Sequence, residues 1–380
     1  MQHTLNACTF SRYNGILIVP RYYFRNFTPR GTFAITYREE KMQAQPKPNV
    51  LSAIDKSLSA AEEDSLAVKL PTPGIVLLTG ETALDLIDRM STNDLQHLNI
   101  GNFTPTVLTN PNARIIDLIW VSLSERGVLV LTSPNKEQDV RNWLKSHIFF
   151  QDDVQFADWP HGWTSWGIYG PKAQERLSAL FPKIEPISST YTYAEKDAYM
   201  WFTDEPVNGI RLLLDHEKSE QAQDLWSDNS AEDAAILAFE LLRMEAGIPA
   251  SPSEINAEYI PLEVGLWNAV SFSKGCYTGQ EIIARMESRE RVARQLAAVH
   301  LEDFAPQGSK IRLESRSIGE LTSIAHSPRS GWIGLAVVRS KAIDSGNLQC
   351  EIGEGAIPGN ISALAGVRYL PWALSESTPA

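Results

Sequence analysis

The amino-acid sequence predicts an α+β protein made of two α+β units of similar plan, followed by a small antiparallel β-barrel or sandwich. The first indication is an internal repeat, because Gly80 and Ala83 recur 90 residues later as Gly170 and Ala173, each pair after an apolar run. The second is the texture after about Arg294, where short alternating runs are separated by turn residues. A chain of 380 residues is long enough for several such domains.

The first unit opens with a strand that leads into a helix. The apolar run 74–79 has the length of a buried strand, and the apolar spacing over 83–90 has helical period. Three further apolar runs lie within 106–131, separated by turn residues, and an amphipathic stretch follows at 135–147. We therefore expect a strand, a helix, three strands and a helix in this order.

The second unit repeats the strand and helix from Trp166 onward. A strand at 211–215 and a long helix at 231–246 follow, and Gly247 and Pro249 end that helix. The C-terminal part then contains six short runs that predict strands of a barrel or sandwich, at 296–301, 310–313, 319–325, 333–338, 348–352 and 360–365.

Composition excludes several classes of protein. The net charge of −12 disfavours direct binding to nucleic acid, and no apolar run approaches the roughly 18 residues of a membrane-spanning helix. The three cysteines, Cys8, Cys276 and Cys350, include no CxxC pair, which favours a reducing compartment. Because the histidines show no HxxxH or HExxH spacing, we expect no metal site.

The first 41 residues differ from the rest in charge, since they contain six Lys or Arg and only two acidic residues, Glu39 and Glu40. This composition fits either an organellar transit peptide or an unstructured extension, and either Met1 or Met42 could be the working start. We therefore expect a cytoplasmic protein, with the mitochondrial matrix as the alternative if residues 1–41 are a transit peptide.

The segment 273–285 (SKGCYTGQEIIAR) carries the most chemical information. Thr278 and Glu281 have the spacing of a capping box, which predicts that Cys276 lies just before the N-terminus of a helix. The positive helix end and the ammonium group of Lys274 would then favour the thiolate form of Cys276. The alternative is a buried cysteine with only a structural role.

These residues resemble a known family. Residues 274–281 (KGCYTGQE) match the KGCYxGQE signature of YgfZ-type folate-binding proteins, which assist iron–sulfur cluster assembly and repair. Two further segments are similar to the wider glycine-cleavage T-protein superfamily of GcvT-like aminomethyltransferases: 91–94 (STND) and 243–247 (RMEAG). The resemblance covers about residues 68–370.

The resemblance implies a fold and a division of the chain. The superfamily has two ferredoxin-like α+β units and a small antiparallel β-barrel around a central folate channel. The expected parts are a flexible extension or targeting segment at 1–50, a folate-binding first unit at 51–160, a second unit at 161–290 that ends in the motif, and a barrel at 291–375.

The resemblance also implies site residues. Cys276 and Lys274 are the expected reactive residues, and tetrahydrofolate or a derivative is the expected cofactor, held by Asn93, Asp117, Tyr277, Gln280, Glu281 and Arg285. Asp117 could equally be a solvated or turn-forming residue. A cluster formed by Arg285, Arg289, Arg291 and Arg294 could attract a polyglutamate tail or RNA phosphate, or simply form a solvated helix face.

Two departures separate the chain from the aminomethyltransferases. Their paired-Asp segment, GGIxDDL, corresponds here to 112–118 (NARIIDL), in which only Asp117 is acidic. Their GYTGE segment, which holds the pterin, is absent from the corresponding region near 201–204 (WFTD). Aminomethyl transfer in glycine cleavage is therefore not expected.

Three functions remain. The leading one is a folate-binding accessory protein for iron–sulfur cluster assembly or repair, with iron–sulfur enzymes (tRNA-modifying ones among them) or cluster carriers as partners. The second is a folate-dependent transferase of aminomethyl or methyl groups, with Asp117 as its acid or base. The third is a non-catalytic, folate-gated scaffold in which Cys276 only packs. If the protein is an enzyme, a folate-dependent transferase is expected.

Overall fold

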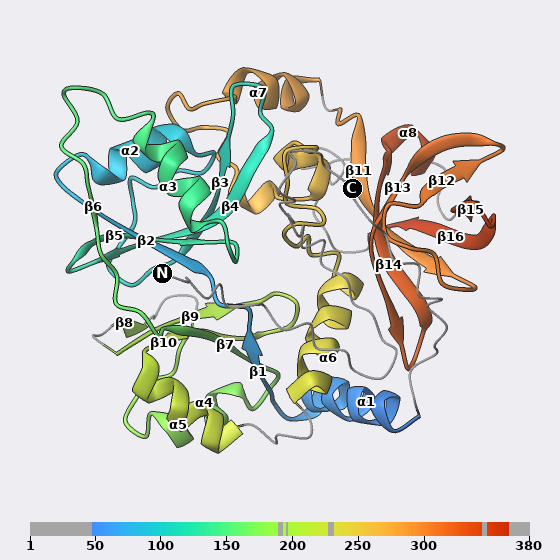
Figure 1. Cartoon of the computed structure of the whole chain (residues 1–380), viewed down its shortest axis with the longest axis horizontal. Helices are drawn as coiled ribbons and strands as arrows, with labels where there is room; N and C mark the ends of the chain where they lie inside the picture. The colour runs from blue at the N-terminus through green and yellow to red at the C-terminus, as the bar shows by residue number, and fades with distance from the viewer. Residues whose placement is uncertain are drawn as a thin grey trace, which may run out of the picture.

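The computed structural model describes residues 48–188, 193–194, 197–226, 232–289, 291–343 and 348–364. Almost all of the expected extension at 1–50 lies outside these residues. Two antiparallel five-stranded sheets and a closed six-stranded barrel make up the described structure, with helices between them (Figure 1). The mixed α and β fold and the barrel confirm the sequence prediction, whereas the ferredoxin-like description of the units remains a prediction.

The first sheet has the strand order β3-β4-β5-β2-β6 and is covered by helices on one face. Apolar side chains of β2, β4 and β5 pack there against those of two helices. The elements are β2 (Gly74–Thr79), α2 (Ala83–Met90), β3 (Thr104–Thr109), β4 (Ile115–Ser124), β5 (Gly127–Thr132), α3 (Glu137–Lys145) and β6 (Gln155–Ala157). The predicted order of strands and helices is confirmed.

The second sheet has the order β1-β7-β10-β9-β8, with α4 and α5 on one face. Its elements are β1 (Leu66–Leu70), β7 (Thr164–Tyr169), α4 (Ala173–Leu180), β8 (Tyr193–Ala194), β9 (Ala198–Thr203), β10 (Gly209–Leu214) and α5 (His216–Trp226). The internal repeat is visible here, because β7 and α4 lie 90 residues after β2 and α2.

The repeated glycines have a geometric cause. Gly80 and Gly170 both turn the chain from strand to helix with φ of 108° and 116°. A Cβ atom at Gly80 would lie 2.2 Å from the carbonyl oxygen of Asp153, and one at Gly170 would lie 2.7 Å from that of Ala61. Only glycine fits a backbone of this conformation at so close an approach.

The first described strand lies with the second sheet, not with the first. Strand β1 pairs antiparallel with β7, so that Leu66 lies opposite Tyr169 and Leu70 opposite Ser165. The sequence division placed residues 66–70 in the first unit, at 51–160. The apolar pattern of a strand does not specify its partner, which explains the difference. The domain boundaries as a whole remain a prediction.

The barrel is closed in the order β11-β14-β13-β12-β15-β16. The six predicted runs correspond to β11 (Arg294–Leu301), β12 (Lys310–Leu313), β13 (Arg316–Ser327), β14 (Gly331–Arg339), β15 (Leu348–Ile352) and β16 (Ile357–Ala363), with the short α8 (Ser340–Ile343) after β14. Closure leaves the barrel without an open sheet edge.

Helices join the three bodies. Helix α1 (Pro48–Glu63) packs along α6 (Glu232–Glu245), and both lie between the second sheet and the barrel (Figure 1). Two short 3-10 helices, η1 (Pro261–Val264) and η2 (Trp267–Ala269), and helix α7 (Gln280–Ser288) connect α6 to the barrel. Among the described residues no helix is long and apolar enough to cross a membrane.

The first prediction concerns the shared core of α1, α6 and the barrel. Leu58 on α1 is 1% exposed in this core, so Leu58→Ala should lower the free energy of unfolding by about 2–4 kcal/mol. The matched control is Lys56→Ala on the exposed side of the same helix, which should change it by about 0.5 kcal/mol at most. Urea denaturation followed by circular dichroism measures both. Equal effects of the two variants would contradict the packing of α1.

Candidate functional site

The motif loop is anchored to the first unit by the buried ammonium group of Lys274. Its side chain is 2% exposed. The Nζ atom donates to the Asp88 carbonyl oxygen (2.7 Å), Asp88 Oδ1 (2.8 Å), the Ser91 carbonyl oxygen (3.2 Å) and the Asn93 carbonyl oxygen. Burial lowers the pKa of Lys274, whereas the hydrogen bond to Asp88 opposes that shift.

The STND segment at 91–94 takes part in this contact at the C-terminal end of α2. The Asp88 and Ser91 carbonyl groups stand at the C-terminal end of α2, where helix carbonyls lack partners inside the helix and where a cation is favourable. The cation that satisfies them comes from a loop 186 residues away in sequence. The contact therefore holds the loop after η2 against the end of α2.

The expected effect of Lys274 on the thiol of Cys276 does not match this geometry. Four oxygen atoms of the first unit surround the ammonium group, which has only three protons to donate. Its charge is neutralised by Asp88 at 2.8 Å. In this structure Lys274 therefore positions the loop, and the role of a reactive residue for Lys274 remains a prediction.

Asn93 is held by the same junction. Its Nδ2 atom donates to the carbonyl oxygens of Pro105 (2.9 Å) and Asn268 (3.2 Å), and its Oδ1 atom accepts from the backbone of Asp94. The neighbouring Thr92 donates from Oγ1 to the carbonyl oxygen of Ala269 at 2.6 Å. The side chain of Asn93, an expected folate contact, thus joins α2, β3 and η2.

The predicted capping box is not formed. Helix α7 begins at Gln280, and its N-cap is Gly279 with φ of 86° and no side-chain cap. The carbonyl oxygen of Thr278 instead accepts a hydrogen bond from Thr109 Oγ1, and Glu281 is exposed. The expectation fails because the backbone of residues 278–279 is fixed by packing on the β3–β4 turn, where a Cβ on Gly279 would lie 2.8 Å from the Asn110 carbonyl oxygen.

The remaining motif residues divide into buried and exposed. Tyr277 packs in the apolar cluster with Ala113 and Ile283, and burial raises its pKa to about 12. Cys276 is exposed, as is Arg285 on α7, whereas Gln280 is half-buried. The exposure of Cys276 contradicts the alternative of a buried structural cysteine. Lys274 and Tyr277 fix the loop on both sides of the thiol.

Asp117 is completely buried on β4, but it does not face the second sheet. It lies opposite Leu108, whose side chain belongs to the core under α2 and α3. Its Oδ2 atom accepts from the backbone N–H of Ser133 at 2.8 Å, and Oδ1 has no partner among the described residues. Burial raises the pKa of Asp117 to about 6.

The opposite face of β4 is apolar at this point. Leu118 packs against the central core that includes α6 and η1, and Trp120 packs against the cluster between the two sheets. Successive side chains of a strand point to opposite faces. Asp117 therefore does not reach this face of the strand, on which Leu118 and Trp120 lie.

Aromatic side chains lie between the two sheets. Trp201 on β9 stacks on Phe103 with ring centroids 4.2 Å apart, and Trp120 lies 6.2 Å from it. Its indole Nε1 is buried and has no acceptor among the described residues. Sequence reasoning did not identify Trp201 as a site residue, although ten Trp residues in the chain are a signal for such a cluster.

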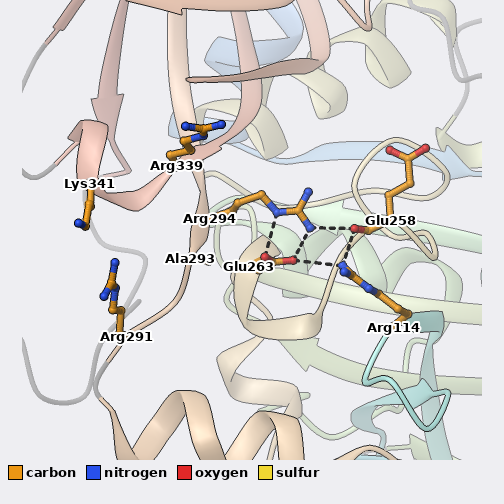
Figure 2. A pocket seen from close by; sticks show the side chains of 8 residues that line it. All are labelled: Arg114, Glu258, Glu263, Arg291, Ala293, Arg294, Arg339 and Lys341. Atoms are coloured by element: carbon orange, nitrogen blue, oxygen red, sulfur yellow. Dashed lines mark hydrogen bonds and ion pairs between the residues drawn. The ribbon is translucent and has the colours of Figure 1, made fainter. Parts of the chain in front are cut away.

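The predicted arginine cluster is divided by the structure. Arg285 and Arg289 lie on or just after α7, whereas Arg291 and Arg294 line a pocket at the start of the barrel, together with residues far away in sequence (Figure 2). Among the described residues, no group of three or more His, Cys, Asp or Glu side chains is placed to hold a metal ion.

Comparison with known proteins places this arrangement in a family. A model described as the GCVT N-terminal domain matches residues 19–274. The chain belongs to the GCVT N-terminal domain family. The match ends at Lys274, the residue that anchors the motif loop.

Relatives extend the similarity beyond this domain. An Arabidopsis thaliana protein named "Putative transferase At1g60990, chloroplastic" is 29% identical over 77% of this chain and 69% of its own. An aminomethyltransferase of Thermoanaerobacter pseudethanolicus is 26% identical over 73% of this chain and 79% of its own. The crystal structure of glycine cleavage system aminomethyltransferase T from Bartonella henselae has the same fold, with a TM-score of 0.70 at 16% identity over 83% of this chain and 91% of that one.

The second prediction tests the anchoring role of Lys274. Lys274→Met removes the cation but keeps most of the side-chain volume, and it leaves Asp88 as an uncompensated buried charge, so it should lower the free energy of unfolding by about 3–5 kcal/mol. Adding Asp88→Asn should restore about 1 kcal/mol or more, because the unpaired charge is then absent. Arg285→Met on the exposed side of α7 is the control. A loss below about 1 kcal/mol for Lys274→Met in urea denaturation would rule out the anchor.

The third prediction follows from the burial of Asp117. The pKa of the Asp117 carboxyl group is about 4 in the unfolded chain and about 6 in the folded one. The free energy of unfolding of the protein therefore falls as the pH rises through this range. Asp117→Asn keeps an acceptor for Ser133 and removes the charge. Its gain in unfolding free energy should be about 1 kcal/mol larger at pH 8 than at pH 5. The exposed Asp139→Asn is the control; the same gain at both pH values would contradict the buried, charged state of Asp117.

Proposed function

We propose that this protein is a folate-binding accessory protein for iron–sulfur cluster assembly or repair and does not catalyse aminomethyl transfer. The observation that carries this proposal is the orientation of β4. The two acids of the paired-Asp segment correspond to Ile116 and Asp117 in this chain, so the first of them is replaced by an apolar side chain. The remaining acid, Asp117, is completely buried and faces the helices, where it accepts a hydrogen bond from Ser133.

The space between the sheets supports the binding of a folate. Trp201 presents a buried indole N–H that has no acceptor among the described residues, beside the rings of Phe103 and Trp120. A buried donor without a partner is costly unless a ligand satisfies it. Trp201 would donate its indole N–H to the pterin, and Phe103, which stacks on Trp201, would complete the aromatic wall. When bound, tetrahydrofolate supplies nitrogen atoms that carry a one-carbon group.

The exposed thiol of Cys276 supports a role toward iron–sulfur proteins. The buried residues on either side, Lys274 and Tyr277, hold the loop rigid, while the sulfur atom faces solvent. Cysteine thiolates are the ordinary ligands of iron–sulfur clusters. A single thiol does not hold a cluster alone, so the partner, an iron–sulfur enzyme or a cluster carrier, would supply the other ligands.

A folate-dependent transferase is the second candidate, because several relatives are named aminomethyltransferases. This candidate requires an acid or base other than Asp117. The third candidate, a scaffold in which Cys276 only packs, is less well supported because Cys276 is exposed. The cytoplasm remains the proposed location, and the name of the chloroplastic relative adds support to the organellar alternative.

The fourth prediction tests folate binding and turnover. Titration of the purified protein with 5-formyltetrahydrofolate by calorimetry should show saturable binding. Trp201→Phe keeps an aromatic ring but loses the N–H donor, so it should weaken binding about ten-fold. Trp143→Phe, which removes another buried indole N–H that has no acceptor among the described residues, should bind as the wild type does. Absence of binding would exclude a folate-dependent function, and turnover of an aminomethyl donor would favour the transferase.

The role of Cys276 is separable from folate binding. In cells that depend on this protein, Cys276→Ser should lower the activity of iron–sulfur enzymes while the purified variant still binds folate. Cys350→Ser is the control, because Cys350 is buried and burial raises its pKa to about 11. For the same reason, iodoacetamide should alkylate Cys276 faster than Cys350 in the folded protein. If Cys276→Ser leaves the cluster enzymes fully active, the accessory role through this thiol is wrong.

A further inference from the structure

A basic pocket lies where the barrel meets the rest of the chain. Its volume is about 600 Å³, within the roughly 300–1,000 Å³ of typical small-molecule sites. It is lined by five cationic side chains, two acidic ones and one alanine: Arg114, Arg291, Arg294, Arg339, Lys341, Glu258, Glu263 and Ala293. An excess of positive charge in a hollow is unexpected in a chain of net charge −12.

Half of the pocket is neutralised internally. Arg294 binds Glu263 through two hydrogen bonds, of 2.9 and 2.7 Å, and Arg114 lies 3.6 Å from the same carboxylate. Both arginines also donate to the carbonyl oxygen of Glu258, at 2.7 Å for Arg114 and 2.9 Å for Arg294. Figure 2 shows this group on one side of the pocket, with the Glu258 carboxylate directed away from Arg291 and Lys341.

The other half is formed by cations. Arg291, Arg339 and Lys341 form no ion pair with any acid in the described part of the chain. In Figure 2, Arg291 and Lys341 point toward one another from opposite sides of the pocket. Each of the three is exposed, so their charges are accessible from solvent.

The backbone brings these cations together. Arg294 and Arg339 lie directly opposite each other on β11 and β14, an arrangement of like charges that destabilises a sheet. Next to this pair, Ser340 donates from its N–H to the Ala293 carbonyl oxygen (3.1 Å) and from its hydroxyl to the Val292 carbonyl oxygen (2.7 Å). These bonds fix the segment that carries Arg291 beside the segment that carries Arg339 and Lys341.

We infer that Arg291, Arg339 and Lys341 form a binding site for a small polyanion, a molecule with two or more adjacent phosphate or carboxylate groups. Guanidinium groups bind both kinds of anion through paired, charge-assisted hydrogen bonds. A single anionic group would leave most of the positive charge uncompensated. The ion pair of Arg294 with Glu263 lines the other side of the pocket. The site does not depend on the folate proposal.

The fifth prediction is tested by calorimetry on the full chain, without divalent metal and at constant ionic strength. Sodium pyrophosphate and tri-γ-glutamate are the two probes, and acetate is the single-charge control. Saturable binding of pyrophosphate, of triglutamate or of both is expected, and the tighter probe identifies the phosphate or the carboxylate source. If neither probe binds saturably at millimolar concentration, or if acetate binds as tightly, the inference is wrong.

Variants decide whether the pocket is the site. Changing Arg291, Arg339 and Lys341 together to Gln should weaken binding about 100-fold or more, since each charge-assisted contact contributes several-fold. The matched control changes three exposed cations elsewhere, Lys56→Gln, Lys183→Gln and Arg316→Gln, and so removes the same net charge. The control should lose less than about three-fold. Equal losses in the two triple variants would show a general charge effect and no site.

Thermal stability gives an independent measurement. Because Arg339 lines the same pocket as Arg291 and Lys341, and none of the three is paired with an acid among the described residues, Arg339→Gln should reduce the repulsion between them and raise the melting temperature of the ligand-free protein at low salt. Saturating pyrophosphate should then stabilise the wild type more than the variant. A purely structural arginine would behave differently, since its replacement would lower the melting temperature with and without the probe, and that result would contradict the inference.

Discussion

The buried ammonium group of Lys274 is the interaction on which the arrangement of the motif depends. One cation satisfies the carbonyl groups at the end of α2, neutralises Asp88 and binds the Asn93 carbonyl oxygen. A buried charge is tolerated only with such complete pairing. The loop that carries Cys276 therefore cannot leave the first unit without exposing an unpaired carboxylate, and the thiol stays in a fixed, solvent-facing position.

The family fold persists here while the chemistry at one strand changes. Strand β4 keeps a buried acid, Asp117, but that acid faces the helices and accepts a hydrogen bond from Ser133. The inward face carries Leu118, so the space between the sheets is lined by apolar and aromatic groups. A fold supports many activities, and the side chains on one face of one strand decide which of them is available.

The cations at the start of the barrel are only partly paired with acids among the described residues. The ion pair of Arg294 with Glu263 joins the first barrel strand to η1 through two hydrogen bonds, and it is partly buried. The neighbouring Arg339 lies directly opposite Arg294 and forms no ion pair with an acid in the described part of the chain. Repulsion of this kind lowers stability. A ligand that supplies negative charge would explain why positive charge is concentrated in one pocket of an acidic protein.

The sequence by itself determined many of the local elements: the repeat marked by Gly80 and Gly170, the six barrel strands, and strands β2, β3, β4, β5, β7 and β10. It did not predict strands β1, β6, β8 and β9 or helices α1 and α5. Periodicity and turn chemistry encode such elements because they act between near neighbours in the chain. Only the tertiary structure decided which groups bind Lys274 and which face of the sheet Asp117 lies on. It also decided that Thr278 does not cap α7 and that Arg291 lies near Lys341. Those outcomes depend on which segments distant in sequence pack against one another, and no local sequence pattern specifies that packing.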